Sequence, residues 1–169
     1  MSAMQYYLQT QRAGYNVCPY FYEREVKIMA EFTNVQLQEV AINQNVLFAD
    51  TTSNCNSGCV GHRTGSGLFT LSPKTNNCKA KFRVDFSGNI SVPSTGTAGE
   101  ISLSIAINGE PDLSTKAVVT PTATQALFNV ATGTDIWVTR GCCVQVSIKN
   151  TSDQAIDVSN ANITVNRIG

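Results

Sequence analysis

The stretch Lys-Ala-Lys-Phe-Arg-Val-Asp-Phe at residues 79–86 decides the fold class of this chain. Every second side chain in it is apolar: Ala80, Phe82, Val84 and Phe86. The side chains between them are charged, and this two-residue period is typical of a strand with one face buried and the other in water. The sequence therefore predicts a half-buried β-strand here.

The same period recurs on both sides of this stretch. Residues 101–107 alternate between large apolar and small side chains, and Asn108-Gly109 then offers a tight turn because both residues tolerate positive φ. Further strands are predicted at residues 35–48, 62–71, 117–120, 126–130, 135–139, 142–149 and 155–167, with breaks at 94–96, 133 and 140–141. About nine short strands separated by turn signals predict an all-β fold, an antiparallel sandwich or barrel.

The composition limits the size of the protein and its partners. At 169 residues the chain suits one domain with one core. Charged residues make up 14% and the net charge is zero, with no dense Lys or Arg run to neutralise phosphates, so we expect no nucleic-acid binding. No apolar run approaches the roughly 18 residues that cross a bilayer, and the first 28 residues lack the apolar region of a secretion signal. We therefore expect no membrane association.

Catalytic chemistry has little support because His62 is the only histidine. Gly65-Ser66-Gly67 lacks the spacing of a nucleophile elbow, and a strand rather than a helix is predicted after it. The glycines more simply allow a bulge or a close strand crossing. We expect no enzymatic activity and no cofactor.

Residues 1–28 do not follow the strand period. Aromatic side chains crowd there without regular spacing: Tyr6, Tyr7, Tyr15, Tyr20, Phe21 and Tyr22. One interpretation is an irregular N-terminal arm that buries aromatics on a partner. The other is that Met29 is the native start, because Arg24-Glu25-Val26 can be encoded by AGG GAG GUN, a purine stretch like a bacterial ribosome-binding site. The chain is divided accordingly into residues 1–31, an arm or a non-native upstream extension, and a domain at residues 32–169.

Several segments from Met29 onward resemble short proteins of gut phages and prophages. They are Phe32-Thr-Asn-Val35, Asn45-Val-Leu-Phe48, Gly61-His-Arg63, Gly65-Ser-Gly67, Ile107-Asn-Gly-Glu110, Arg140-Gly-Cys-Cys143 and the close from Asn160-Ala-Asn162 to Arg167-Ile168. That family has the trimeric jelly-roll fold of the tumour-necrosis-factor and complement-head type, and the tip domains of collagen-like spore-surface glycoproteins have a similar layout. The resemblance implies a jelly-roll sandwich and a homotrimer whose inner sheets supply an apolar seam.

Two apolar side chains are candidates for the trimer contact. Leu68 and Trp137 fall out of phase with the core-facing residues beside them, so each is expected to point outward. An outward Leu or Trp on a polar surface is typical of a subunit contact. The alternative is that each lies under a loop.

The six cysteines leave three alternatives open. They are Cys18, Cys55, Cys59, Cys78, Cys142 and Cys143. In the topology that the resemblance implies, a strand beginning at Cys78 pairs antiparallel with one beginning at Cys142, which separates these two by roughly 25–30 Å at about 3.3 Å per residue. The loop with Cys55 and Cys59 is expected to return to the end that carries Cys142 and Cys143, near His62. The thiols are then free or buried, joined in disulfides, or ligands of a zinc ion held by Cys55, Cys59, Cys142 and His62.

The favoured function is structural, and it follows from the resemblance. The chain is expected to be a trimeric head fibre or capsid decoration protein, made in the bacterial cytoplasm and displayed on the virion surface, with the major capsid protein as a second partner. Docking on the capsid is assigned to aromatics at the N-terminal side: Tyr15, Tyr20, Phe21, Tyr22 and Phe32.

A receptor- or glycan-binding tip on a spore, a tail fibre or a bacterial surface is the alternative. It would use the loops at residues 51–60, 94–99 and 120–125. These loops contain no Trp, Tyr or Phe to form a platform for a sugar, which favours the decoration role.

Overall fold

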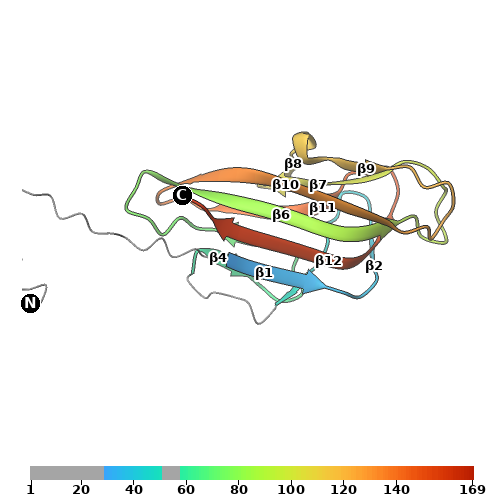
Figure 1. Cartoon of the computed structure of the whole chain (residues 1–169), viewed down its shortest axis with the longest axis horizontal. Coiled ribbons are helices and arrows are strands. Elements are labelled where there is room, and N and C mark those ends of the chain that lie inside the picture. The colour runs from blue at the N-terminus through green and yellow to red at the C-terminus, as the bar shows by residue number, and fades with distance from the viewer. Residues whose placement is uncertain (1–28, 51–57) are drawn as a thin grey trace, which may run out of the picture.

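Two antiparallel sheets stack face to face in the computed structural model, which describes residues 29–50 and 58–169 (Figure 1). Sheet A has the strand order β10-β6-β12-β1-β3, and β2 also pairs with β12. Its strands are β1 (Met29–Asn34), β2 (Gln38–Val40), β3 (Ala49–Asp50), β6 (Lys79–Ser91), β10 (Phe128–Thr139) and β12 (Ile156–Arg167).

Sheet B has the order β4-β5-β11-β7-β8, and β9 also pairs with β7. Its strands are β4 (Val60–His62), β5 (Phe69–Leu71), β7 (Ile101–Ile107), β8 (Glu110–Pro111), β9 (Ala117–Val119) and β11 (Val144–Asn150). A 3₁₀ turn, η2 (Leu113–Thr115), joins β8 to β9. In the described part of the chain, no helix is long and apolar enough to cross a membrane. The two antiparallel sheets confirm the expected all-β sandwich.

β6 contains the stretch that decided the fold class, and its two faces are as expected. Ala80, Phe82, Val84 and Phe86 are at most 2% exposed, whereas the side chains between them reach solvent. β6 pairs with β10 along one edge and with β12 along the other. β6 is therefore an interior strand of sheet A, flanked by β10 and β12, as the green strand of Figure 1 shows.

Five phenylalanines form the centre of the core between the sheets. They are Phe32, Phe48, Phe69, Phe82 and Phe86, each at most 2% exposed. The Phe48 ring lies 5.3 Å from Phe69 of sheet B and 6.4 Å from Phe86 of sheet A, measured between centroids. Each buried ring contributes about 1.5–3 kcal/mol from its removal from water. Phe48 thus joins the two layers.

The expected strand at residues 35–48 is only partly confirmed, because β2 (Gln38–Val40) is the one strand within it. β1 ends at Asn34, whose Oδ1 accepts a hydrogen bond from the backbone N–H of Gln36 at 3.1 Å. This side chain to backbone bond closes a local turn that replaces the strand ladder. Val35 and Leu37 are consequently 64% and 65% exposed. β1 begins at Met29, so the sandwich starts before the expected boundary at residue 32.

Two other boundaries differ because of glycines. The expected strand at residues 62–71 is a hairpin of β4 and β5, with Gly65 at φ +80° in its loop. The expected break at Gly133 is absent, since β10 runs through it and pairs with β6 on both sides. The turn at Asn108-Gly109 is confirmed, with φ of 52° and 89°.

Candidate interaction surface

The solvent side of sheet A, called the A face below, is a surface that four long or paired strands of this sheet present together. It carries Met29 and Glu31 from β1, Lys79, Lys81, Arg83, Asp85 and Ser87 from β6, Gly133, Asp135 and Trp137 from β10, and Asn162, Thr164 and Asn166 from β12. Most of these side chains are polar or charged. The A face therefore differs from the apolar seam that the family resemblance implies.

A row of ion pairs crosses the A face from β10 to β6. The Lys81 Nζ lies 2.6 Å from Asp135 Oδ2, and the Arg83 Nη1 lies 3.4 Å from Asp135 Oδ1. Arg83 also donates from Nε and Nη2 to Asp85 Oδ1, each at 2.8 Å. The register places Asp135 directly opposite Arg83, which is why one carboxylate reaches both cations.

These pairs keep their charges over a wide pH range. The hydrogen bond from Lys81 lowers the pKa of Asp135, with Arg83 adding to the effect. The hydrogen bond to Asp85 raises the pKa of Arg83. All four side chains are partly exposed, so salt screens the attraction and the row contributes little to the stability of the protomer.

Trp137 is an exposed aromatic side chain at one end of the A face. It is 53% exposed, as expected from its phase in the sequence. The Lys79 Nζ lies 4.2 Å from the centroid of the Trp137 ring, and the Lys81 Nζ lies 5.7 Å from it. These cation–π contacts hold the ring without covering it. The exposed area remains available for a contact outside the protomer.

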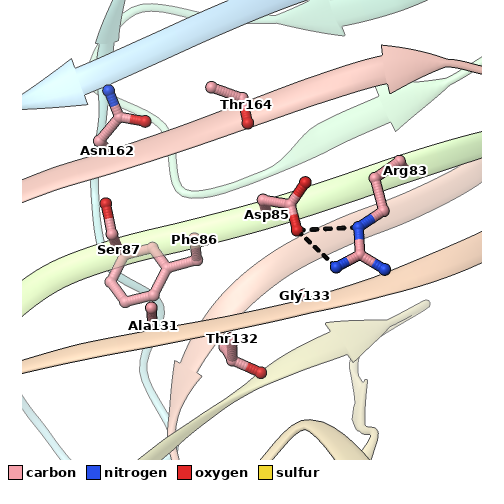
Figure 2. Close-up of a pocket in the computed structure, with 9 residues that line it drawn as sticks. All are labelled: Arg83, Asp85, Phe86, Ser87, Ala131, Thr132, Gly133, Asn162 and Thr164. Carbon is pink, nitrogen blue, oxygen red and sulfur yellow. Dashed lines mark hydrogen bonds and ion pairs between the residues drawn. The ribbon is translucent and has the colours of Figure 1, made fainter.

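A shallow depression of about 400 Å³ lies beside the ion pairs (Figure 2). Its lining residues come from three strands: Arg83, Asp85, Phe86, Ser87, Ala131, Thr132, Gly133, Asn162 and Thr164. Figure 2 shows the Arg83 and Asp85 side chains next to Gly133. A Cβ at Gly133 would lie 2.1 Å from Asp85 Oδ1 and 2.8 Å from Arg83 Nη2. The glycine is therefore required by the side chains across the ladder, and it does not mark a break.

Leu68 and Trp137 do not share a surface. Leu68 is 40% exposed and immediately precedes β5 of sheet B, whereas Trp137 belongs to β10 of sheet A. Both point outward as expected, but they lie on opposite layers of the sandwich. The two side chains therefore do not form one continuous patch on the protomer, and their role in a trimer contact stays a prediction.

The expected docking role of Phe32 conflicts with its position. Phe32 is 2% exposed in β1, and its ring lies 4.6 Å from His62 and 4.9 Å from Phe69, between centroids. Its phase in β1 places it inside the sandwich, so it is a core residue. The other expected docking residues lie outside the described residues: Tyr15, Tyr20, Phe21 and Tyr22.

His62 is built into the aromatic core. Its ring stacks on Phe69 at 4.6 Å and 17°, and its Nε2 lies 3.0 Å from the carbonyl oxygen of Ser66. These contacts give the imidazole a packing role and fix the loop before β5.

The expected zinc ligands are only partly described. Cys55 lies outside the described residues, Cys59 is buried and Cys142 is exposed. Within residues 29–50 and 58–169, no three His, Cys, Asp or Glu side chains are placed to hold a metal ion. The zinc site stays a prediction.

The expected position of Cys78 is wrong. β6 pairs with β10 rather than with β11, and the register sets Lys79 opposite Thr139. Cys78 therefore lies at the same end of the sandwich as Cys142 and Cys143. Cys59 lies at this end as well, because Val60 and Val144 both pair with Leu71. That return of the loop to the Cys142 end was expected.

Comparison with known proteins places the fold. The Eiger TNF structure from S. frugiperda has a TM-score of 0.58 at 11% identity, covering 85% of this chain and 93% of the other. Murine APRIL at pH 5.0 has a TM-score of 0.55 at 5% identity, covering 84% and 99%. The fold is that of the TNF jelly roll. The globular domain of the zebrafish complement 1qA protein has a lower TM-score of 0.46, at 12% identity over 84% and 96%.

Sequence comparisons add no family. No protein-family model matches the chain, and no curated protein matches it.

Sequence reasoning missed the row of ion pairs and the depression. Arg83 and Asp85 are two residues apart on one strand, which signals a shared face. Asp135 is 50 residues further on, and its place opposite Arg83 follows only from the pairing of β10 with β6.

Proposed function

We propose that this chain is a homotrimeric, non-enzymatic module of a bacteriophage particle, either a head fibre or a capsid decoration protein. Its partners are two further copies of itself and the major capsid protein. It is made in the bacterial cytoplasm and displayed on the virion surface. The proposal gives it no catalytic residues and no cofactor.

The phage assignment is supported by the segments that resemble gut phage and prophage proteins and by their order along the chain, from Phe32-Thr-Asn-Val35 to Arg167-Ile168. The TNF-type jelly roll is the fold that this resemblance implied. The surface supports display outside a cell, since charged residues make up 14% of the chain.

The A face carries the trimer proposal. It combines an exposed aromatic, Trp137, with a depression at Gly133 four residues away on the same strand. Two different patches on one face allow each copy to contact the next head to tail, and a three-fold rotation between copies closes such contacts into a ring. Trp is also the residue type most enriched among the side chains that dominate binding energy. We assign the contact to Trp137 and to the strands around the depression.

Because the A face is polar, the stability of this interface is expected to depend on ionic strength, whereas an apolar seam would be much less sensitive to salt. Lys81, Arg83 and Asp135 lie within the proposed contact and are partly exposed in the single protomer. Association that encloses them depends on charge complementarity between copies. Raising the ionic strength is therefore expected to weaken the trimer.

The test of the interface is the mass of two variants in solution. Trp137→Ala removes the exposed ring from the A face, and Leu113→Ala removes an equally isolated apolar side chain, 68% exposed, from η2. Light scattering after size-exclusion chromatography measures both against the unaltered chain. We expect Trp137→Ala to dissociate at concentrations where the unaltered chain and Leu113→Ala stay trimeric. Equal masses for the two variants at every concentration would contradict the assignment of Trp137.

The proposed role in the virion is tested on the natural phage particle. Particles induced from the source bacterium are purified, imaged by negative stain with an antibody to this chain, and analysed by mass spectrometry. We expect the antibody to label the capsid surface and the peptides to copurify with the major capsid protein. Particles that lack the chain would contradict the role. The same spectra identify the N-terminus, and a peptide from upstream of Met29 would exclude Met29 as the native start.

A receptor- or glycan-binding tip is the second candidate, and the exposure of Trp137 favours it. An exposed indole beside Asp135 and two lysines has the form of a platform for a sugar ring, which the expected distal loops lack. A glycan array distinguishes the two candidates. Binding that Trp137→Ala abolishes, together with the absence of the chain from particles, would favour the tip.

A further inference from the structure

Two connections run side by side at one end of the sandwich. Residues 72–78 lead from β5 to β6, and residues 140–143 lead from β10 to β11. They start from and end at paired residues, since Leu71 is opposite Val144 and Lys79 is opposite Thr139. Both connections therefore cross from one sheet to the other at the same end of the sandwich.

Hydrogen bonds tie the two connections to each other. The backbone N–H of Arg140 donates to the carbonyl of Cys78 at 2.8 Å, and its Nη1 donates to the carbonyl of Asn76 at 3.3 Å. The N–H of Cys142 donates to the carbonyl of Thr139 at 3.1 Å, which closes a turn. Cys78 is thus the lateral neighbour of a four-residue turn that carries Cys142.

Three exposed thiols lie in these two connections. Cys78, Cys142 and Cys143 are each exposed and form no disulfide in the structure. Cys59 is next to them in the fold, but it is 1% exposed, and its carbonyl accepts from the N–H of Ser72 at 2.8 Å. Among the described residues, the cysteines therefore separate into one buried thiol and three that solvent reaches.

The charge around these thiols is positive. Arg140 lies in one connection and Lys74 in the other, and Arg167 reaches the carbonyl of Lys74 with its Nη1 at 3.0 Å. Residues 58–62, 71–81, 137–145 and 165–169 contain no Asp or Glu. This cationic end attracts anionic small molecules, which include the oxidised form of the tripeptide thiol glutathione.

We propose that Cys78 and the Cys142–Cys143 pair are an oxidation site, in which Cys78 forms an intramolecular disulfide with one member of the pair. A bond between Cys142 and Cys143 themselves is disfavoured. Neighbouring Cα atoms are about 3.8 Å apart across a trans peptide, closer than the roughly 4.4–6.8 Å of ordinary disulfides, and the described chain has no cis peptide.

Glutathione disulfide is the oxidant of the step. The Cys78 thiol attacks one of its sulfurs and releases one reduced glutathione, and the second protein thiol then displaces the other. The two protein thiols lose two electrons and two protons in total, and the oxidant takes them up as two glutathione thiols. The new bond joins the two connections and closes a loop of more than 60 residues between Cys78 and Cys142.

Peptide mapping of the full chain tests the proposal. Trypsin releases Cys78 in residues 75–79 and the pair in residues 141–149, so a disulfide between them gives one cross-linked peptide. The folded chain is incubated with oxidised glutathione, alkylated and digested without reductant. We expect the cross-linked peptide in the unaltered chain and in Cys59→Ser, and its absence in Cys78→Ser. The oxidised chain should run as a monomer on a non-reducing gel and unfold about 10 °C higher than the reduced chain.

Any one of three results would contradict the proposed disulfide. The peptide of residues 75–79 is recovered only in alkylated or glutathione-bound form, the peptide of residues 141–149 carries an internal bond, or the cross-link appears only in a covalent dimer. Cys78 is exposed, so Cys78→Ser is expected to fold, and its unchanged circular dichroism is the control.

Discussion

Replacing Phe32 by alanine tests most sharply how the two sheets are held together. Phe32 is 2% exposed, and its ring contacts His62 of β4 and Phe69 of β5, so it joins sheet A to sheet B. Truncating a buried phenylalanine costs about 3–5 kcal/mol, because burial of the ring is lost and a cavity remains. Two ring contacts place this side chain in the middle of that range or above it. We expect the free energy of unfolding to fall by about 4 kcal/mol.

Urea unfolding at one fixed protein concentration measures the loss, with Trp137 fluorescence and circular dichroism as probes. The matched control is Leu37→Ala, because Leu37 is 65% exposed in the bend after β1 and should change stability by less than about 0.5 kcal/mol. In a heating experiment the Phe32 variant should unfold about 8–16 °C lower. A loss below about 1 kcal/mol, or one equal to that of the control, would refute the core position of Phe32.

Three further substitutions test other parts of the structure. Asn150→Ala should cost about 3 kcal/mol in urea unfolding, because the buried amide donates to the carbonyls of Val40 and Gln154, each at 2.9 Å, and both carbonyls would lose this donor. A cost below about 1 kcal/mol contradicts this. Asp157→Asn should stabilise the protein at pH 7, because burial, and then the charge of Glu39, raise the pKa of Asp157 and make its ionised form unfavourable in the fold. This gain should vanish as the pH falls through the raised pKa and Asp157 takes up its proton, whereas a gain that does not change with pH points to another cause. Gly109→Ala should cost about 1 kcal/mol because Gly109 has φ +89°, and an equal cost at Gly99, which has ordinary φ, would reject the explanation.

The sequence predicted which faces of the strands are buried, because the two-residue period depends on neighbouring residues alone. β6 and β7 were located in this way, and so was the turn at Asn108-Gly109. The period does not show which strand pairs with which in the sheet. That is why Cys78 was placed at the wrong end, since the pairing of β6 with β10 joins residues 38 to 60 positions apart.

The candidate surface was predictable only in part, for the same reason. Trp137 was recognised because it is out of phase with Ile136 and Val138 on its own strand. Gly133 was interpreted as a break, since its role depends on Asp85 and Arg83 across the ladder. The bend at Val35 was missed because Asn34 closes it with a side-chain hydrogen bond, which a strand-like period does not reveal.

The proposed trimer requires three copies to meet through the A face, and the mass of the unaltered chain in solution tests this most directly. Sedimentation equilibrium of the full chain at micromolar concentration and low salt should give three times the 18.2 kDa of one chain, with dissociation as salt is added. A mass of 18.2 kDa across the micromolar range would contradict the proposed assembly.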